Sequence, residues 1–358
     1  MKSTSQLAQS IERFRRGFWL RETVDRPPVG VIPARAWLPI QYAREPLRRE
    51  ELLPDDVGST LARTDYEDSF ATRPVESDDF VPYIAAWRAV PWLEAMCGCP
   101  VRASAGSLAA ARCVRSAEEL ETAAIPARAD WMETLYRETS RLSDTAPADC
   151  WVSTSILRGP SDVLAAMRGL DNFLLDLHDD PRAVARAAAR INQLHLDVLD
   201  KHFSLVGPKL GGYGHIFGYC APAPTTVIQE DAMGLCSPAV YRDLFMPLSA
   251  QIVKHLGTHV LFHLHSTGYR HYTHVLEVPG IAGLEITVET NGPRLADMVP
   301  ALREILERSR LILMVDGHMD QLPEALRKLP GEGLYLTVSD KFVRGEKEFR
   351  SLMRLGHS

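Results

Sequence analysis

The sequence contains no run of about 18 apolar residues, the length that a membrane-spanning helix needs, and its first residues lack the apolar core of a signal peptide. An excess of positive charge is also missing, because 40 lysines and arginines stand against 46 acidic residues, for a net charge of -6. This balance creates no basic field that would attract nucleic acid or an anionic membrane. We therefore expect a cytoplasmic protein whose partner is a small-molecule substrate.

Cysteine is scarce and follows no disulfide pattern. The six cysteines are scattered through apolar surroundings, and a reducing compartment would keep them as thiols. Only the Cys97-Gly98-Cys99 segment resembles part of a metal site. It has no second half at the spacing of a metal site, so packing or a turn is the favoured interpretation.

Several common chemical signatures are absent as well. The sequence has no glycine-rich phosphate loop, no recognisable Ser-His-Asp arrangement and no interleaving of basic and aromatic residues. What it does have is the composition of an ordinary globular protein, with 358 residues of which 46% are hydrophobic and 24% charged. That length is ample for a sizeable core.

Strand-like and helix-like segments alternate regularly after about residue 149. Helical patterns separate the strand-like runs, and a further short apolar run at 29–33 has the character of a first strand. Strands are expected at 150–156, 213–219, 259–263, 282–286, 311–315 and 334–338. Helices are expected at roughly 161–178, 181–206, 237–256, 293–309, 320–328 and 345–354.

This repetition of βα units favours a parallel sheet. With one or two strands from residues 28–110, the count reaches about eight, which predicts the α/β class and a closed (β/α)8 TIM barrel. We expect a single domain over residues 1–358. An amphipathic helix would occupy residues 1–27 and lie across the barrel, and elaborated loops would occupy about 40–110.

Two histidines stand two residues apart at the end of the strand-like run at 259–263. Side chains alternate between the two faces of a strand, so His263 and His265 would point to the same side. The C-terminal ends of barrel strands form the active-site rim. We expect the pair to face a metal or a substrate there, although hydrogen bonds to loop carbonyls are the structural alternative.

Other polar residues follow the expected strands and would share this rim. Imidazole nitrogen and carboxylate oxygen are both acceptable ligands in an open zinc site, so the set could hold a metal. Helix capping and ion pairing are equally compatible with each residue alone. Arg35 follows the first strand, where it would present a cation to an anionic substrate group or pair with a neighbouring carboxylate. The polar residues of this set are Asp231, Glu285, His318 and Asp340.

Several segments resemble the uroporphyrinogen decarboxylase superfamily. Residues 158–169 are similar to its G-P-apolar-G signature, and residues 230–238 are similar to the segment that leads into the histidine strand. Residues 317–320 resemble the family's G-N-x-D, and residues 93–100 its L-E-A-x-G-C-P. The matches run in order from about residue 24 to 350. The superfamily is a (β/α)8 barrel, so the resemblance implies the same fold as the alternating pattern.

The superfamily has two characterised arms, and the sequence departs from both. True decarboxylases carry R-Q-A-G-R after the first strand, a catalytic Asp and a Tyr in the G-P segment. Here residues 33–39 keep at most one arginine, Arg35, and the Tyr position is Ala166. Tetrapyrrole carboxylates need several cations, so this loss argues against uroporphyrinogen as substrate.

The other arm comprises zinc-dependent methyltransferases that move methyl groups between a corrinoid carrier and a thiol. Its members have H-x-C on the equivalent strand and a further Cys near the C-terminus. Here the corresponding residues are His263 and His265, followed by Asp340 in place of the late Cys. The resemblance implies a metal site with harder ligands, which would bind Zn2+ and accept Fe2+ or Mn2+ more readily than a thiolate site does.

The resemblance therefore implies a metal-dependent methyltransferase-like enzyme. We expect His263, His265 and Asp340 to bind the metal, with Glu285 and His318 as residues that orient ligands or act as acids and bases. The metal would lower the pKa of a substrate thiol or related nucleophile, so that it can attack a methyl donor.

The remaining expectations concern substrate, partners and alternatives. Arg35 and Asp231 are expected to bind substrate, and a corrinoid methyl donor, a corrinoid protein as partner and a homodimer are compatible with this prediction. A first alternative is a metal-independent decarboxylase or lyase that grips a carboxylated small molecule through Arg35. A second is a barrel that binds a ligand without catalysis.

Overall fold

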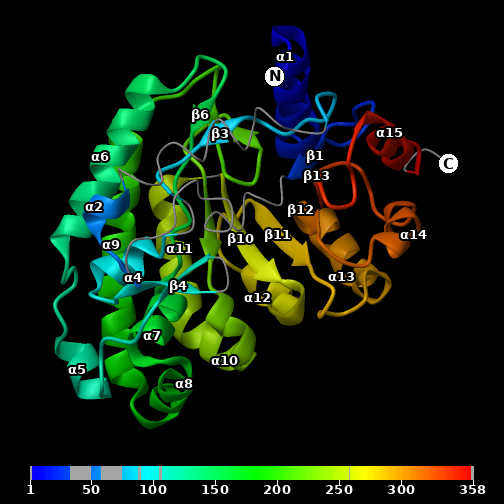
Figure 1. Cartoon of the computed structure of the whole chain (residues 1–358). Helices are drawn as coiled ribbons and strands as arrows, with labels where there is room; N and C mark the ends of the chain where they lie inside the picture. The colour runs from blue at the N-terminus through cyan, green and yellow to red at the C-terminus, as the bar shows by residue number, and fades with distance from the viewer. Residues whose placement is uncertain are drawn as a thin grey trace.

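The computed structural model describes residues 2–32, 50–57, 75–87, 90–104, 107–257 and 259–355. Six strands pair side by side in one sheet, in the order β1-β13-β12-β11-β10-β9 (Figure 1). All five pairings are parallel, so the C-terminal ends of the six strands meet at one edge. The strands are β1 (Val29–Ile32), β9 (Thr226–Gln229), β10 (Val260–His265), β11 (Gly283–Val288), β12 (Arg310–Val315) and β13 (Leu334–Ser339).

Helices connect the strands of this sheet. Ser237 caps the helix that begins at Pro238, because its hydroxyl accepts a hydrogen bond from the Val240 N–H and Pro238 occupies the first helical position. The later helices are α10 (Pro238–Val240), α11 (Met246–Leu256), α12 (Tyr272–Val275), α13 (Leu295–Arg308), α14 (Leu322–Leu326) and α15 (Glu346–Leu355), with π-helical or 3-10 turns at η6 (Tyr241–Phe245), η7 (Ser266–His271) and η8 (Met319–Gln321).

The first half of the chain adds a second group of helices. In Figure 1 the long α6 and α9 run together on the side of the molecule opposite α13 and α14. The helices of this half are α1 (Thr4–Arg13), η1 (Phe14–Trp19), α2 (Pro54–Asp56), α4 (Trp92–Met96), α5 (Ala117–Thr122), α6 (Ala129–Thr145), α7 (Pro160–Arg168), α8 (Leu170–Asp179) and α9 (Pro181–Leu205), and η5 (Asp231–Leu235) follows β9.

Smaller pairings accompany the main sheet. A parallel pair, an antiparallel trio and an antiparallel hairpin form within the described residues. They are β3 (Tyr83–Ile84) with β6 (Trp151–Val152), β2 (Glu51–Leu52) with β4 (Val101–Ser104) and β5 (Ser107–Ala110), and β7 (Tyr213–Gly214) with β8 (Cys220–Ala221).

The structure therefore shows a mixed α/β architecture built on a six-stranded parallel sheet. A closed eight-stranded barrel stays a prediction. Within the described residues, β3 and β6 pair with each other, and a single parallel bridge between Arg158 and Gln229 connects the segment after β6 to β9. The sequence prediction of the strands at 259–263, 282–286, 311–315 and 334–338 is confirmed to within a few residues.

The prediction of a barrel strand at 213–219 is wrong. Tyr213–Gly214 instead forms one arm of a short antiparallel hairpin, and the strand that joins the parallel sheet is Thr226–Gln229. Glycine explains the difference, because Gly218 has a positive φ of 71°, a left-handed conformation that interrupts a strand.

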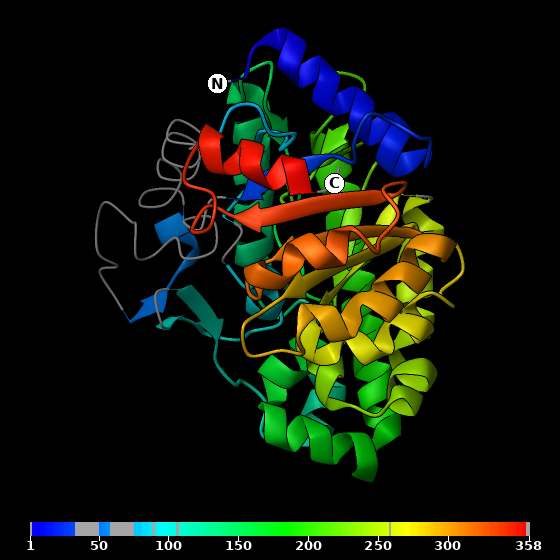
Figure 2. The ribbon, with the colours of Figure 1, turned by 90° about the vertical axis from the view of Figure 1, so that its right-hand side faces the viewer.

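The N-terminal segment closes the edge of the sheet at which the strands begin. Figure 2 shows α1, in blue, crossing the top of the molecule, and η1, which follows it, contacts β13. The rings of Phe14 and Tyr335 lie 4.8 Å apart, and the indole of Trp19 donates a 2.7 Å hydrogen bond to the Cys220 carbonyl. Since Tyr335 lies at the start of β13, this aromatic contact covers the N-terminal ends of the strands, as the amphipathic pattern predicts.

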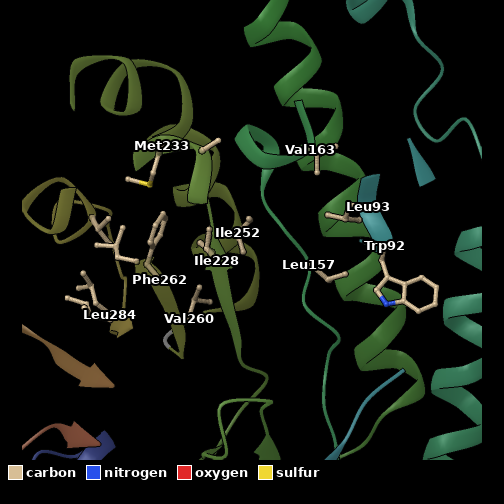
Figure 3. Packing of buried hydrophobic residues seen from close by; sticks show 14 of the residues in the cluster. Trp92, Leu93, Leu157, Val163, Ile228, Met233, Ile252, Val260, Phe262 and Leu284 are labelled. Carbon is tan, nitrogen blue, oxygen red and sulfur yellow. The ribbon is translucent and has the colours of Figure 1, made fainter. Parts of the chain in front are cut away.

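The apolar face of the strands packs against the surrounding helices. Figure 3 shows Phe262 of β10, Ile228 of β9 and Ile252 of α11 gathered in one apolar cluster. Burying one such side chain stabilises the fold by about 1.5–3 kcal/mol. Because strand side chains alternate, Phe262 and Leu264 on the helix side place His263 and His265 on the other side.

Among the described residues, no helix combines the length and apolar character that a membrane crossing requires.

Candidate metal site

Three side chains converge at the C-terminal edge of the sheet. His263 and His265 come from β10, and Asp231 follows β9, the strand that pairs with β10. One ligand atom from each residue lies within 4.8 Å of the others. Asp231 Oδ1 is 3.6 Å from the Nε2 atom of His263 and 3.6 Å from that of His265. This is the separation of atoms that could share one bound cation.

A second carboxylate orients each imidazole. The Nδ1 atom of His263 hydrogen-bonds to the buried Glu285, and the Nδ1 atom of His265 lies 2.6 Å from Glu289 Oε1. An ionised carboxylate only accepts hydrogen bonds, so each imidazole donates its Nδ1–H and turns its Nε2 atom toward Asp231. Metal-binding histidines commonly have such carboxylate partners, which fix the tautomer and the ring orientation.

One oxygen of the Asp231 carboxylate, Oδ2, accepts a hydrogen bond, and the other, Oδ1, accepts none within the described residues. Gln229 donates a 2.6 Å hydrogen bond to Oδ2. Oδ1 is buried and has no hydrogen-bond partner among the described residues, although the side chain as a whole is partly exposed. A buried acceptor without a partner is costly, and a cation placed between Oδ1 and the two Nε2 atoms would satisfy it. The geometry therefore fits a metal ion.

The charges of Asp231 and the histidines shift one another's pKa values. Burial alone would raise the pKa of Asp231, but its interactions with His265 and His263 lower that pKa well below its usual range. Burial alone would lower the pKa of His265, but Asp231 and Glu289 raise it to about 10. At neutral pH a metal ion that binds His265 must displace a proton, so metal binding releases protons and strengthens as the pH rises.

A cavity of about 490 Å3 adjoins the histidines. Phe217 forms one wall, and its ring stacks on His263 with centroids 6.0 Å apart. The volume suits a small organic molecule, and the histidines are its polar end. Apolar atoms of Ile32, Ile156, Phe217 and Met314 and polar atoms of Gln229, Thr287, Glu289, Asp316, Ser339 and Lys341 complete the lining.

The carboxylate beside the histidines is Asp231, which was predicted to bind substrate. The group found among the described residues does not contain Asp340, whose role as a metal ligand stays a prediction. Strand order explains why Asp231 lies next to the histidines. Asp340 follows β13, which β11 and β12 separate from β10, whereas Asp231 follows β9, the direct neighbour of β10. The backbone N–H of Asp340 donates to the Ile32 carbonyl of the adjacent β1.

The other predicted residues have different positions. Glu285 lies directly behind His263 and also accepts a 2.9 Å hydrogen bond from Thr287. His318 follows β12 in a left-handed conformation with φ 54°, and its buried Nε2 has no hydrogen-bond partner in the described part of the chain. It is outside the group of three possible ligands. Arg35 lies outside the described residues.

Glu289 and Gln229 are site residues that the sequence analysis missed. Glu289 follows β11 directly, and strand alternation places it on the same face as Glu285 and Thr287. That alternation was the available signal. Gln229 was hidden because β9 was not recognised as a strand, and its register opposite His263 is visible only in the folded chain.

A layer of buried carboxylates supports the loop that carries Asp231. Glu230 accepts a 2.7 Å hydrogen bond from the Ser161 N–H at the start of α7, and Asp162 in turn accepts one of 2.7 Å from the Ala232 N–H. Burial raises the pKa of Glu230 to about 7, against the lowering effect of Ser161. A Cβ on Gly159 would lie 2.4 Å from the Glu230 carboxyl group, so this contact requires glycine.

Comparison with known proteins identifies a shared fold. No protein-family model matches the sequence, and no curated protein matches it. Among solved structures, a methyltransferase from Methanosarcina mazei superposes with a TM-score of 0.61 at 13% sequence identity, and the match covers 98% of each chain. At this identity the likeness shows the fold alone.

Proposed function

We propose that the protein is a metal-dependent methyltransferase-like enzyme in which Asp231, His263 and His265 hold a divalent cation. One observation carries the proposal: two oriented imidazoles and an unsatisfied carboxylate oxygen converge within 4.8 Å beside a cavity. Nitrogen and oxygen ligands suit Zn2+, and also Fe2+ or Mn2+. Three protein ligands leave a coordination position for a substrate atom, as catalytic zinc sites do.

The bound cation would supply Lewis acidity, which lowers the pKa of a coordinated thiol or related nucleophile. The residues of the chain prepare the site for this role. Glu285 and Glu289 hold the Nδ1 protons and keep both rings in place, and Gln229 holds Asp231. A deprotonated nucleophile held near the site could attack an electrophilic methyl group.

The cavity supports a small substrate. Its apolar wall, which includes Phe217 and Met314, would exclude water from the nucleophile, and Thr287 and Ser339 offer hydroxyl groups for orientation. We assign a small thiol or related nucleophile as the methyl acceptor. Methyl transfer is supported by the fold shared with the Methanosarcina mazei methyltransferase and by the sequence motifs, and a corrinoid is the proposed methyl donor.

The first test is metal content. The protein, purified without chelators, is expected to contain about one divalent metal ion per chain by elemental analysis, or to take one up from Zn2+ or Fe2+ solution. His263→Ala and Asp231→Ala should each reduce this occupancy to near zero. Asp340→Ala is the matched control, because it removes the alternative carboxylate and should leave the occupancy unchanged. Retention of metal by Asp231→Ala together with its loss from Asp340→Ala would contradict the assignment.

The second test is methyl transfer itself. The metal-loaded protein is incubated with methylcobalamin and a panel of small thiols, and demethylation of the corrinoid is followed by absorbance. Turnover that disappears in His263→Ala and in the chelated protein would support the proposal. Activity on a carboxylated molecule that a chelator leaves unchanged would replace it with a metal-independent lyase.

A further inference from the structure

Two cysteine thiols face each other at the base of the β4–β5 hairpin, remote in sequence from the metal ligands. Cys99 precedes β4 and Cys113 follows β5, and their Sγ atoms are 3.5 Å apart. The hairpin ladder continues to this point, since Val101 pairs with Ala110 and the Ala111 N–H donates a 2.7 Å hydrogen bond to the Pro100 carbonyl. Backbone pairing thus holds the two chain segments at the spacing of neighbouring strands.

The two thiols have unequal surroundings. Cys99 is buried, whereas Cys113 is exposed. The hydrogen bond from Cys99 lowers the pKa of Cys113, and the same hydrogen bond together with burial raises the pKa of Cys99. Cys113 is therefore the accessible thiol of the pair and the one that ionises more readily. Buried Cys99 is placed to react with it in a second step.

We propose that Cys99 and Cys113 form an oxidisable dithiol, a modification site at which a peroxide converts the pair to an intramolecular disulfide. The inference is independent of the proposed methyl transfer. It rests on the contact between the sulfur atoms and on the exposure of one of them, and the other four cysteines, all buried, have no such sulfur–sulfur contact.

The reaction balances with hydrogen peroxide as oxidant. The Cys113 thiolate attacks one peroxide oxygen, the O–O bond breaks, and the products are a sulfenic acid on Cys113 and hydroxide, which takes up the proton that the Cys113 thiol released and becomes the first water molecule. The Cys99 sulfur then attacks the Cys113 sulfur, the S–S bond forms, and the S–O bond breaks to release a second water molecule with the Cys99 proton. Two thiols are oxidised and one peroxide is reduced.

The required movement is small. A disulfide has an S–S distance of about 2.05 Å, so the sulfur atoms must approach by about 1.5 Å. The backbone at Cys113 is anchored to the end of α7, because the N–H groups of Cys113 and Val114 donate to the Met167 carbonyl at 3.1 and 2.9 Å. Closure by side-chain rotation therefore leaves both chain segments in their present positions.

The test uses the full-length protein, reduced and then exposed to a small excess of hydrogen peroxide. After alkylation of the remaining thiols, the intact mass should show the loss of two hydrogen atoms, and peptide mapping should find residues 99 and 113 linked. A reducing agent should restore both thiols. An unchanged thiol count, or Cys113 oxidised to sulfinic acid without a link, would overturn the proposal.

Three variants sharpen the assignment. Cys113→Ser should abolish the linked peptide, and Cys99→Ser should leave Cys113 to accumulate as sulfenic acid, which a dimedone probe traps. Cys97→Ser is the matched control, because Cys97 lies two residues from Cys99 and its carbonyl is within 3.9 Å of Cys113 Sγ. It should keep the full yield of the link. A disulfide between Cys97 and Cys113 in the wild-type protein would show that Cys113 reacts with Cys97 and not with Cys99. That result would refute the proposal.

Discussion

Two aspartates, Asp79 at the start of β1 and Asp231 after the end of β9, show how a structural carboxylate differs from a candidate metal ligand. Asp79 supports the first strand: one oxygen accepts from the Val29 N–H at 3.0 Å and contacts Arg26, and the other accepts from Arg13 at 2.9 Å. Asp231 has one oxygen held by Gln229 and one buried oxygen without a partner in the described chain. Both oxygens of the first carboxylate have partners in the folded chain, whereas one oxygen of the second faces the two imidazoles, where a cation would bind.

The largest expected effect is a difference in unfolding free energy between alanine variants of the two aspartates. Asp79→Ala removes the buried carboxylate that Arg13, Arg26 and the Val29 N–H share, which should cost about 3–5 kcal/mol of unfolding free energy. Asp231→Ala should cost the metal-free protein less, because Asp231 is partly exposed and its partner His265 keeps Glu289 as a second carboxylate. Urea unfolding of both variants measures the difference. Equal losses of unfolding free energy would contradict the prediction that Asp79 contributes more to stability than Asp231.

The next effect concerns the loop that carries Asp231. Gly159→Ala places a methyl group against the buried Glu230 carboxyl, and the strain should cost about 1–3 kcal/mol of unfolding free energy. Gly207→Ala is the matched control, since a Cβ there meets nothing within 4 Å. Thermal unfolding of the two variants checks the prediction. If Gly159→Ala unfolds at the same temperature as the Gly207→Ala control, residue 159 is not in tight contact with Glu230.

A smaller effect is expected from the carboxylates that orient the imidazoles. Glu289→Gln keeps the size of the side chain but lets its amide nitrogen face His265, so the Nε2 lone pair is no longer directed to the site. Metal affinity should fall about 10–100-fold. Competition with a chromogenic chelator measures the affinity. Glu304→Gln, at an exposed ion pair with Arg308, serves as the control and should have no effect.

The smallest effect is the pH dependence. Because the pKa of His265 is raised to about 10, metal affinity should rise by about tenfold per pH unit between pH 7 and 9, as one proton is released. The same shift predicts that the metal-free protein loses stability as the pH rises from about 6.5 to 10, since the folded state retains this proton longer than the unfolded state does. Affinity that is flat over this range would contradict the charge arrangement.

The sequence predicted those parts of the molecule that depend on local pattern. The alternation of strands and helices after residue 230 and the common face of His263 and His265 follow from periodicity and capping, which short segments encode by themselves. Which carboxylate accompanies the two histidines depends on partners distant along the chain, and the role of Asp340 as a ligand stays a prediction. Asp340 was predicted as the third ligand because it stands in place of the late Cys of the methyltransferases that the sequence resembles.

Strand adjacency decides which of those positions meet. β9 pairs with β10, and this pairing brings Asp231 to the histidines. β9 was not among the expected strands, so the sequence analysis had no basis for placing Asp231 beside the histidines. The register between neighbouring strands depends on tertiary packing, and a periodic pattern in one segment contains no information about it.

Asp231 lies in a connection and both histidines lie on a strand, so the candidate metal site joins a loop to the sheet. A cation held there would tie the start of η5 to the end of β10, and binding energy would add to the stability of the fold by mass action. Release of the cation would remove this link between the loop that carries Asp231 and the strand that carries the histidines. The protease sensitivity of residues 230–236 would then report metal occupancy without any substrate.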